Sequence, residues 1–212
     1  MKSSEPENFL VGIAGGSCAG KTTLAGELRK AVSEIEMVWI PFDAYYKPLD
    51  HLPLSERHLQ NFDSPEMLDW KLFVSDLTKL KSGHPAEIPV YDFAQHTRSS
   101  VTERVEPAPV ILVEGILLFA VPEVLRVLDR TVFLDVPADI RLSRRIERDM
   151  RERGRTARMV IKQYLETVRP MHEKLVEPSR REAEITVGGG GYNPDAIDRV
   201  SKSIRRLTGK AI

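Results

Sequence analysis

The sequence has little that would suit a secreted, membrane-bound or nucleic-acid-binding protein. It contains a single cysteine, which excludes an internal disulfide and is typical of a reducing compartment. Its 31 basic residues equal its 31 acidic ones, so no overall positive field indicates nucleic acid or a membrane surface as a partner. No apolar run approaches the roughly 20 residues that cross a bilayer, and the N-terminal stretch Met1–Asn8 lacks the apolar core of a signal peptide. We therefore expect a cytoplasmic protein without nucleic-acid or membrane partners.

What is present is a phosphate-binding pattern near the N-terminus. The stretch GGSCAGKT, from Gly15 to Thr22, fits G-x-x-x-x-G-K-[ST]. An apolar run expected to form a buried strand precedes it, and a predicted helix follows it up to Val32. The backbone N–H groups of such a loop form an anion site at the helix N-terminus. The residues predicted to bind the nucleotide are Gly15, Gly16, Ser17, Cys18, Ala19, Gly20, Lys21, Thr22 and Thr23.

Two side chains of this loop carry specific expectations. Lys21 is predicted to reach the β- and γ-phosphates, and the Thr22 hydroxyl to hold Mg²⁺. Cys18 is most simply a small filler, with a redox role as the alternative because a helix N-terminus lowers a thiol pKa. The loop predicts a bound nucleoside triphosphate and leaves the fate of the γ-phosphate open.

Apolar runs and helical patterns alternate along the chain and predict an α/β fold. Short runs typical of buried strands occur at 9–14, 37–40, 110–113, 131–135 and 184–187, and helices are predicted at 22–32, 68–81, 138–153, 157–181 and 194–207. This alternation indicates a mostly parallel five-stranded sheet with helices on both faces, within a single domain spanning residues 1–212. We expect a long loop with one short helix over 44–65 and a β-hairpin-like substrate excursion within 86–106. In that excursion, residues 94–100 are predicted to connect strands 87–93 and 101–105.

Acidic residues follow two of the predicted strands. Asp43 comes after the second strand, and Glu114 ends a strand predicted to be buried on both faces. Ligands of open α/β sheets bind outside the carboxyl ends of the strands. Asp43 is therefore a candidate general base for an attacking hydroxyl, and Thr22, Glu114 and Asp43 are candidate metal ligands. The alternative for each acid is a solvated residue that caps the next helix.

The predicted helix 138–153 carries an arginine stripe. Leu142, Ile146 and Met150 share one face at the helical period. Most of the other side is basic, with Arg141, Arg144, Arg145, Arg148 and Arg151, and Arg153-Gly154-Arg155 follows at its end. Guanidinium groups suit phosphate oxygens, so we predict a mobile, arginine-rich lid over 138–165. A solvated charged face, partly compensated by Glu147, Asp149 and Glu152, is the alternative.

Candidate acceptor residues cluster in and before the excursion. Tyr91, Phe93 and His96 offer aromatic faces for a planar base and an imidazole for its polar edge. Any one of these aromatics would otherwise be an ordinary core residue. Asp63 could bind vicinal ribose hydroxyls, or form an Asx turn before Pro65.

Assembled in chain order, these motifs resemble the uridine kinase (uridine–cytidine kinase) family of P-loop nucleoside kinases, from about Phe9 to Ile197. The matching stretches are GIAGGS and KTT in 12–23, DAYYK at 43–47, NFD at 61–63, YDF at 91–93 with His96 and Arg98, VEGIL at 113–117, RLSRR at 141–145, RGR at 153–155, QY at 163–164 and VRP at 168–170. The phosphate loop is shared by many unrelated proteins, whereas the YDF segment and the spaced arginines are far more specific.

The resemblance implies phosphorylation of the 5′-hydroxyl of uridine or cytidine to UMP or CMP in pyrimidine salvage, with ATP or GTP as donor and Mg²⁺. By matching motifs, Asp43 is the general base, Asp63 binds ribose, and Tyr91, His96 and Phe93 form the pyrimidine pocket. The catalytic set is Lys21, Asp43, Arg153 and Arg155, and Arg145, Arg148, Arg155 and Gln163 contact substrate. The family also implies a homotetramer and inhibition by CTP or UTP.

The sequence departs from the family pattern at Ser64, where many relatives have His, at Glu182, where Tyr is usual, and at Cys18-Ala19. The first two departures bear on the acceptor surroundings and feedback inhibition, and none touches the phosphate chemistry. The nearest rival is another small-molecule P-loop kinase, such as a phosphoribulokinase-like or nicotinamide riboside kinase-like enzyme. A GTP-dependent switch protein is disfavoured because the Asn-Lys-x-Asp guanine motif is absent.

Overall fold

The computed structural model describes residues 8–210 and contains a five-stranded sheet in the order β2-β5-β1-β6-β7. Every pair of neighbouring strands in it is parallel. The strands are β1 (Phe9–Gly15), β2 (Met37–Pro41), β5 (Val110–Glu114), β6 (Arg130–Asp135) and β7 (Ile185–Gly188). Each forms where the sequence has a short apolar run, so the predicted sheet is confirmed. The segment Met1–Glu7, on which most of the expectation about a signal peptide rests, lies outside the described residues, as do residues 211–212.

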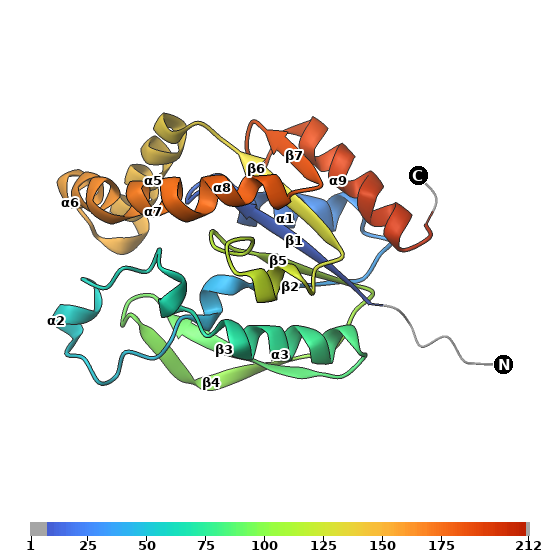
Figure 1. Ribbon diagram of the computed structural model, residues 1–212, viewed down its shortest axis with the longest axis horizontal. Coiled ribbons are helices and arrows are strands. Elements are labelled where there is room, and N and C mark those ends of the chain that lie inside the picture. Colours follow the sequence, from blue (N-terminus) through green and yellow to red (C-terminus); the bar gives the residue numbers. More distant parts are fainter. Residues whose placement is uncertain (1–7, 211–212) are drawn as a thin grey trace.

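Helices cover both faces of this sheet (Figure 1). The α-helices of the described residues are α1 (Lys21–Ala31), α2 (Leu54–Arg57), α3 (Trp70–Lys81), α4 (Pro122–Leu125), α5 (Ala138–Arg153), α6 (Ala157–Gln163), α7 (Arg169–Met171), α8 (Glu177–Ser179) and α9 (Pro194–Leu207), of which α2 lies away from the sheet. Two π-helical segments, η3 (Tyr164–Val168) and η4 (His172–Val176), join α6, α7 and α8 into one continuous helical stretch. No helix of residues 8–210 is long and apolar enough to cross a membrane.

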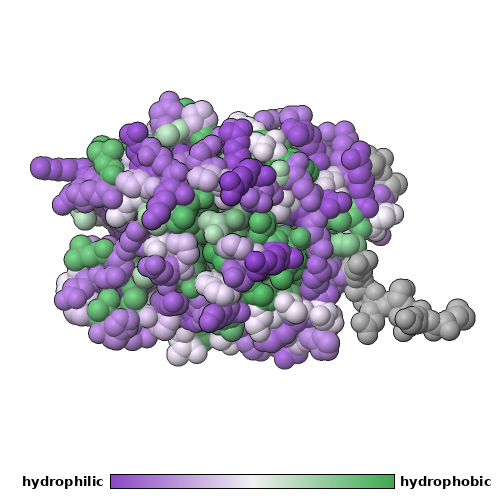
Figure 2. Space-filling model, viewed as in Figure 1, coloured by the Kyte–Doolittle hydropathy of each residue, from purple (hydrophilic) through white to green (hydrophobic). Residues whose placement is uncertain are grey.

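Two hydrophobic cores lie on opposite faces of the sheet. Successive residues of a strand point to opposite faces, so Leu10 belongs to one core and Val11 to the other. One core joins the sheet to α1 and α9, for example through Leu28 and Ile204, and the other joins it to α3 through Phe73. In the view of Figure 1, hydrophilic residues cover most of the surface and hydrophobic ones gather near the middle (Figure 2).

The predicted excursion is an antiparallel hairpin of β3 (Ala86–Asp92) and β4 (Thr97–Val105). The prediction that residues 94–100 connect the strands is wrong, because β4 already begins at Thr97. Thr97 to Ser100 are polar and only partly buried or exposed, so they lack the hydrophobic alternation by which a strand is recognised. The helix predicted from Leu68 begins at Trp70, where the Asp69 side chain accepts a hydrogen bond from the N–H of Leu72 and caps it.

Candidate active site

The phosphate-binding motif forms the turn between β1 and α1. Gly20 precedes the helix with φ of 100°, and Cys18 has φ of 61°, both in the left-handed region. The buried Lys21 folds back, and its Nζ donates hydrogen bonds to the carbonyl oxygens of Gly15 and Gly16, both at 3.1 Å. The loop and its lysine therefore have the shape that the sequence pattern predicts for a phosphate site.

Helix α5 and the loop before α9 pack closely against the phosphate loop. A Cβ on Gly16 would lie 2.4 Å from Nη1 of Arg141, so the arginine side chain rests directly on the loop. A Cβ on Gly191, in the loop before α9, would lie 2.3 Å from the carbonyl oxygen of Gly20. Arg144 donates to the carbonyl oxygen of Ala19. Apolar periodicity does not predict these contacts, and the run of glycines at 188–191 is the sequence signal of the close approach.

Adjacent strands bring two acids to the loop. In the sheet, β5 lies between β1 and β2, and Glu114 at its end is in register with Ile13 and Pro41. Glu114 accepts a hydrogen bond from the Thr22 hydroxyl at 3.0 Å. Asp43 lies just beyond β2 in a short 3-10 turn, η1 (Phe42–Tyr45). The sheet order thus explains how residues far apart in sequence converge beside the phosphate loop.

Burial shapes the ionisation of these acids. It raises the pKa of Asp43, and the positive charges of Lys21 and Arg153 oppose the rise. Burial likewise raises the pKa of Glu114, against the influence of Lys21 and of the hydrogen bond from Thr22. Oxygen ligands in small number fit Mg²⁺, which keeps several waters and binds through substrate phosphates. In residues 8–210 no group of three or more His, Cys, Asp or Glu could hold a metal ion. The Thr22 hydroxyl and the Glu114 carboxylate are oxygen donors of the kind that suits Mg²⁺.

A cavity with an empty volume of about 640 Å³, partly open to solvent, lies beside these acids. It collects all the residues that the sequence predicts to contact the acceptor. They are Asp43, Asp63, Tyr91, Phe93, His96, Arg145, Arg148, Arg153, Arg155 and Gln163. Ser17 of the loop also lines it, together with Tyr46, Phe62 and Ile116. The last three stand inside motifs that the sequence analysis quoted, but they were not singled out because each is typical of a core residue.

Aromatic rings form one wall of the cavity. The Phe62 and His96 rings stack with centroids 5.4 Å apart, and Tyr46 lies 5.2 Å from Phe62 and 5.3 Å from Tyr91. Phe93 meets the Tyr91 ring edge to face at 5.1 Å. The Tyr91 hydroxyl is buried and has no hydrogen-bond partner within the described part of the chain. A planar ligand with polar edges would fit such a wall.

The turn of the hairpin sets the position of the imidazole. The Asp92 carboxylate accepts hydrogen bonds from the N–H groups of Ala94 and Gln95, at 2.8 and 2.9 Å, in an Asx turn. His96 follows with φ of 49°. Burial, assisted by the positive charge of Arg155, lowers the pKa of His96. The imidazole is therefore neutral near pH 7 and can both donate and accept a hydrogen bond.

Asp63 faces the wall from the loop after α2. Its N–H donates to the Asn61 side chain at 3.2 Å, which fixes the turn. Burial raises the pKa of Asp63 and the Arg145 guanidinium opposes the rise. A buried carboxylate with such a neighbour suits hydroxyl groups of a polar ligand.

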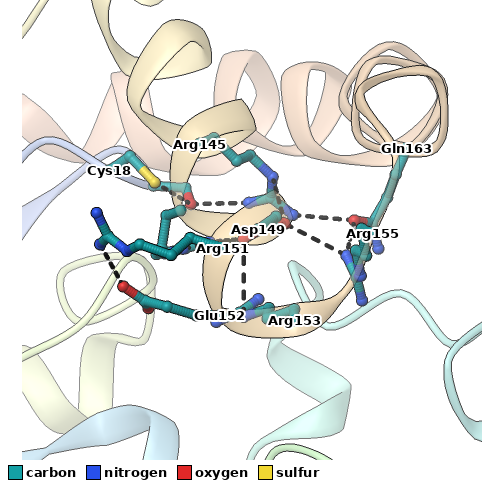
Figure 3. A network of polar contacts seen from close by, with 10 residues as sticks. Cys18, Arg145, Asp149, Arg151, Glu152, Arg153, Arg155 and Gln163 are labelled. Atoms are coloured by element: carbon teal, nitrogen blue, oxygen red, sulfur yellow. Dashed lines mark hydrogen bonds and ion pairs between the residues drawn. The ribbon is translucent and has the colours of Figure 1, made fainter.

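The buried face of the arginine helix α5 is not the face that carries its apolar residues. Arg141, Arg145 and Asp149 are buried, whereas Met150 is 51 % exposed. The helix packs on polar neighbours, so its buried side is the charged one. Arg145 donates to Ser17 Oγ at 2.8 Å and to Gln163 Oε1 at 3.0 Å (Figure 3).

The arginines of the stripe divide into two groups. Arg145, Arg148, Arg153 and Arg155 line the acceptor cavity. Arg141 and Arg144 instead contact the phosphate loop, and Arg151 pairs with Glu152. The predicted common face is therefore only partly confirmed.

A second cavity opens on the other side of the base candidate. Thr22, Glu114 and Trp39 line it, and Asp43, Arg148 and Arg153 line both cavities. The acceptor candidates Tyr91 and Phe93 also line both cavities, whereas the candidate metal ligands Thr22 and Glu114 line the second and not the first. Asp43 therefore borders both spaces.

Comparison with known proteins agrees with this arrangement. Uridine kinase from Chloroflexus aggregans is 49% identical over 91% of this chain and 92% of its own. Uridine kinase from Clostridium perfringens is 41% identical over 95% and 97% of the two chains. Among solved structures, a putative fructose transport system kinase from Silicibacter superposes with a TM-score of 0.70, at 24% identity over 88% of this chain and 93% of that one.

Phosphoribulokinase from Rhodobacter spheroides has the same fold, with a TM-score of 0.66 at 14% identity over 90% of this chain and 74% of that one. Residues 10–193 match the sequence pattern of one family throughout, from the strand before the phosphate loop to the loop before α9. With its phosphate loop, strand-end acids and arginine helix in the places described, the chain belongs to the phosphoribulokinase/uridine kinase family.

Proposed function

We propose that the protein transfers the γ-phosphoryl group of ATP or GTP to the 5′-hydroxyl of uridine or cytidine. The observation that carries this choice of acceptor is the aromatic wall, in which Phe62, His96, Tyr91 and Tyr46 face the acceptor cavity together. A phosphorylated sugar needs no such wall, whereas a nucleobase stacks on it. The relatives named uridine kinase support the same acceptor.

In this proposal the carboxylates act on the sugar. Asp43 accepts the proton of the 5′-hydroxyl as that oxygen attacks phosphorus. Asp63 accepts hydrogen bonds from the ribose hydroxyls and thereby fixes the sugar. Tyr91 and His96 bind the polar edge of the pyrimidine, and Phe93 closes the pocket beside them.

The cations act on the phosphates. Lys21 and the loop N–H groups hold the β- and γ-phosphates, and Arg145, Arg148, Arg153 and Arg155 supply positive charge where negative charge develops in transfer. Gln163 holds two of these guanidinium groups from α6. Thr22 and Glu114, with Asp43 nearby, would hold Mg²⁺. Bound there, Mg²⁺ would neutralise phosphate charge during transfer.

Finer expectations belong to the same proposal. They are one kinase domain with a hairpin for the acceptor and a lid from α5 and α6, a homotetramer, inhibition by CTP or UTP, and a cytoplasmic role in pyrimidine salvage. Light scattering of the purified protein would measure the assembly, and inhibition assays with CTP and UTP would measure the feedback.

An acceptor panel tests the proposal directly. ADP release, coupled to NADH oxidation, would be measured with uridine, cytidine, adenosine, nicotinamide riboside, ribulose 5-phosphate and pantothenate. We expect turnover with uridine and cytidine that exceeds every other acceptor. The product should be identified by mass as UMP or CMP, so that ATP hydrolysis without transfer is not counted. Activity confined to a non-nucleoside acceptor would overturn the proposal, and activity confined to nicotinamide riboside would support the rival kinase.

A further inference from the structure

Asp149 is a fully buried carboxylate surrounded by arginines (Figure 3). It lies near the end of α5, within the stretch that carries the lid arginines. A buried charge without partners costs several kcal/mol, so its surroundings must stabilise it. Within residues 8–210 its ion-pair partners are arginines of the same chain segment, 145–155.

Each carboxylate oxygen serves two arginines. Asp149 Oδ1 accepts from Nε and Nη2 of Arg148, at 2.9 and 2.7 Å, and lies 3.7 Å from Nε of Arg153. Oδ2 lies 3.4 Å from Nη1 of Arg155 and 3.8 Å from Nε of Arg145. The Asp149 carbonyl oxygen also accepts the N–H of Arg155 at 3.2 Å, where Gly154 ends the helix in the left-handed conformation. One residue therefore holds both the side chains and the backbone turn of this segment.

Asp149 itself reaches neither cavity. The acceptor cavity is lined by all four of its arginine partners, and the cavity with the metal candidates by Arg148 and Arg153, but neither includes Asp149. Its carboxylate lies behind the guanidinium groups as seen from the substrate space. Any influence on the reaction therefore passes through the arginines.

The charge count shows why a carboxylate is needed here. Four guanidinium groups within one short segment repel one another and, without a partner, would spread into solvent. One carboxylate draws them together and still leaves a net charge of about three positive units, which can meet phosphates. The neighbouring guanidiniums outweigh the effect of burial and lower the pKa of Asp149, so it remains ionised through the neutral range.

We propose that Asp149 is a positioning residue that gathers Arg145, Arg148, Arg153 and Arg155 into one array aimed at the transferring phosphoryl group. The inference rests on the proposed function only in that the arginines serve phosphoryl transfer. Its role is distinct from that of the cavity residues, because it acts without touching donor or acceptor.

The test is the variant Asp149→Asn, which keeps the shape of the side chain and removes its charge. We expect kcat to fall about 10- to 100-fold, since small misplacements of catalytic groups carry losses of this size. The KM for ATP should change less than about threefold, because Lys21 and the loop backbone are untouched. Glu147→Gln is the matched control, an exposed acid on the same helix without a hydrogen bond or ion pair among residues 8–210, and it should retain wild-type kinetics.

Two further variants separate positioning from folding. Asp149→Glu restores the charge and should recover part of the lost kcat, which a purely structural defect would not predict. In an Arg148→Gln background, Asp149→Asn should lower kcat by a smaller factor than it does in the wild type. The reason is that Arg148→Gln has already removed one of the ion pairs through which Asp149 acts. Melting temperatures of all variants would be measured in parallel.

Three results would overturn the inference. They are near-wild-type turnover by a folded Asp149→Asn protein, equal kcat for Asp149→Asn and Asp149→Glu, and full additivity with Arg148→Gln. A wild-type protein that phosphorylates an acceptor other than uridine or cytidine would refute the proposed function alone. The Asp149 variants would then be compared on that acceptor.

Discussion

At the scale of single residues, Asp43 shows how the sheet determines chemistry. Its own segment is the short turn η1 after β2, in which the neighbouring Phe42, Ala44 and Tyr45 are buried. Its importance comes from its neighbours, namely Glu114 at the end of β5, Lys21 at the start of α1, and the α5 arginines that line both cavities. The residue is therefore a base candidate because of its position between two cavities.

Replacing Asp43 by Asn should lower kcat about 10²- to 10⁴-fold, because the amide keeps the shape but cannot accept the proton of the hydroxyl. Nucleotide binding should survive, since the phosphate loop is unchanged. Steady-state kinetics with uridine and calorimetric titration with a non-hydrolysable ATP analogue would measure the two effects. Glu36→Gln, an exposed acid just before β2, is the control and should behave as wild type. Near-native turnover by Asp43→Asn would remove the assignment.

At the scale of elements, one arginine ties the hairpin to the turn that carries the base candidate. Arg98 on β4 donates to the carbonyl oxygens of Tyr46 and Tyr45, at 3.0 and 3.1 Å, and pairs with Asp69 at the start of α3. Because Tyr45 and Tyr46 follow Asp43 almost directly, the hairpin and the base candidate share one anchor. The acceptor wall and the reacting carboxylate thus keep a fixed separation.

Arg98→Met should therefore loosen the acceptor site. We expect the KM for uridine to rise about tenfold, which corresponds to roughly 1.4 kcal/mol of lost binding, while the KM for ATP stays within about twofold. Arg104→Met is the control, because Arg104 is also on β4 and, within residues 8–210, its side chain pairs only with Glu106 at the surface. Equal increases in both KM values for Arg98→Met would contradict this role of the anchor.

The same scale shows what sequence patterns reveal and what they miss. Strands such as β5 are continuous apolar runs, and such runs are typical of a parallel sheet that helices bury on both faces, so the sheet was predictable. The buried face of α5 was not, because Arg141 and Arg145 bury charge against polar partners from other segments, and Asp149 buries its charge against arginines of its own segment. Apolar periodicity marks the core-facing side only where the neighbour is apolar. The sequence indicated only that Asp149 partly compensates the charge of the arginines. Its proposed positioning role depends on its burial among them, which apolar periodicity does not reveal.

At the scale of the whole molecule, the helical stretch from α6 to α8 supports the phosphate loop through a histidine. His172 Nε2 lies 3.0 Å from Nη2 of Arg141, which rests on Gly16, and 3.5 Å from Glu177. Burial lowers the pKa of His172 to about 4, assisted by the charges of Arg141 and Lys21 and opposed by nearby acids. The fold therefore requires this imidazole to be neutral.

The stability of the protein should depend on pH through this group. Between pH of about 6.5 and about 4, the unfolded chain binds a proton at His172 that the folded protein does not. The free energy of unfolding should therefore fall as the pH falls through this window, by at most about 3 kcal/mol from this residue. His172→Gln keeps an acceptor for Arg141 and does not titrate. The free energy of unfolding of this variant should therefore fall less steeply with falling pH than that of the wild type. Urea unfolding at several pH values would compare the two proteins, and identical pH slopes would contradict the expectation.

The central place of β1 in the sheet has a consequence for how the protein is made. Phe9 pairs with Val110 and Gly15 with Leu134, so the phosphate loop has neither flanking strand until much later residues have been synthesised. At typical elongation rates this wait is roughly 5 to 20 seconds. Meanwhile the apolar residues of β1 are without their partners and suit binding by a chaperone. Nucleotide therefore cannot guide the earliest stage of folding on the ribosome. The phosphate loop is synthesised early, but it takes its folded conformation only after β5 and β6 have been synthesised and have paired with β1.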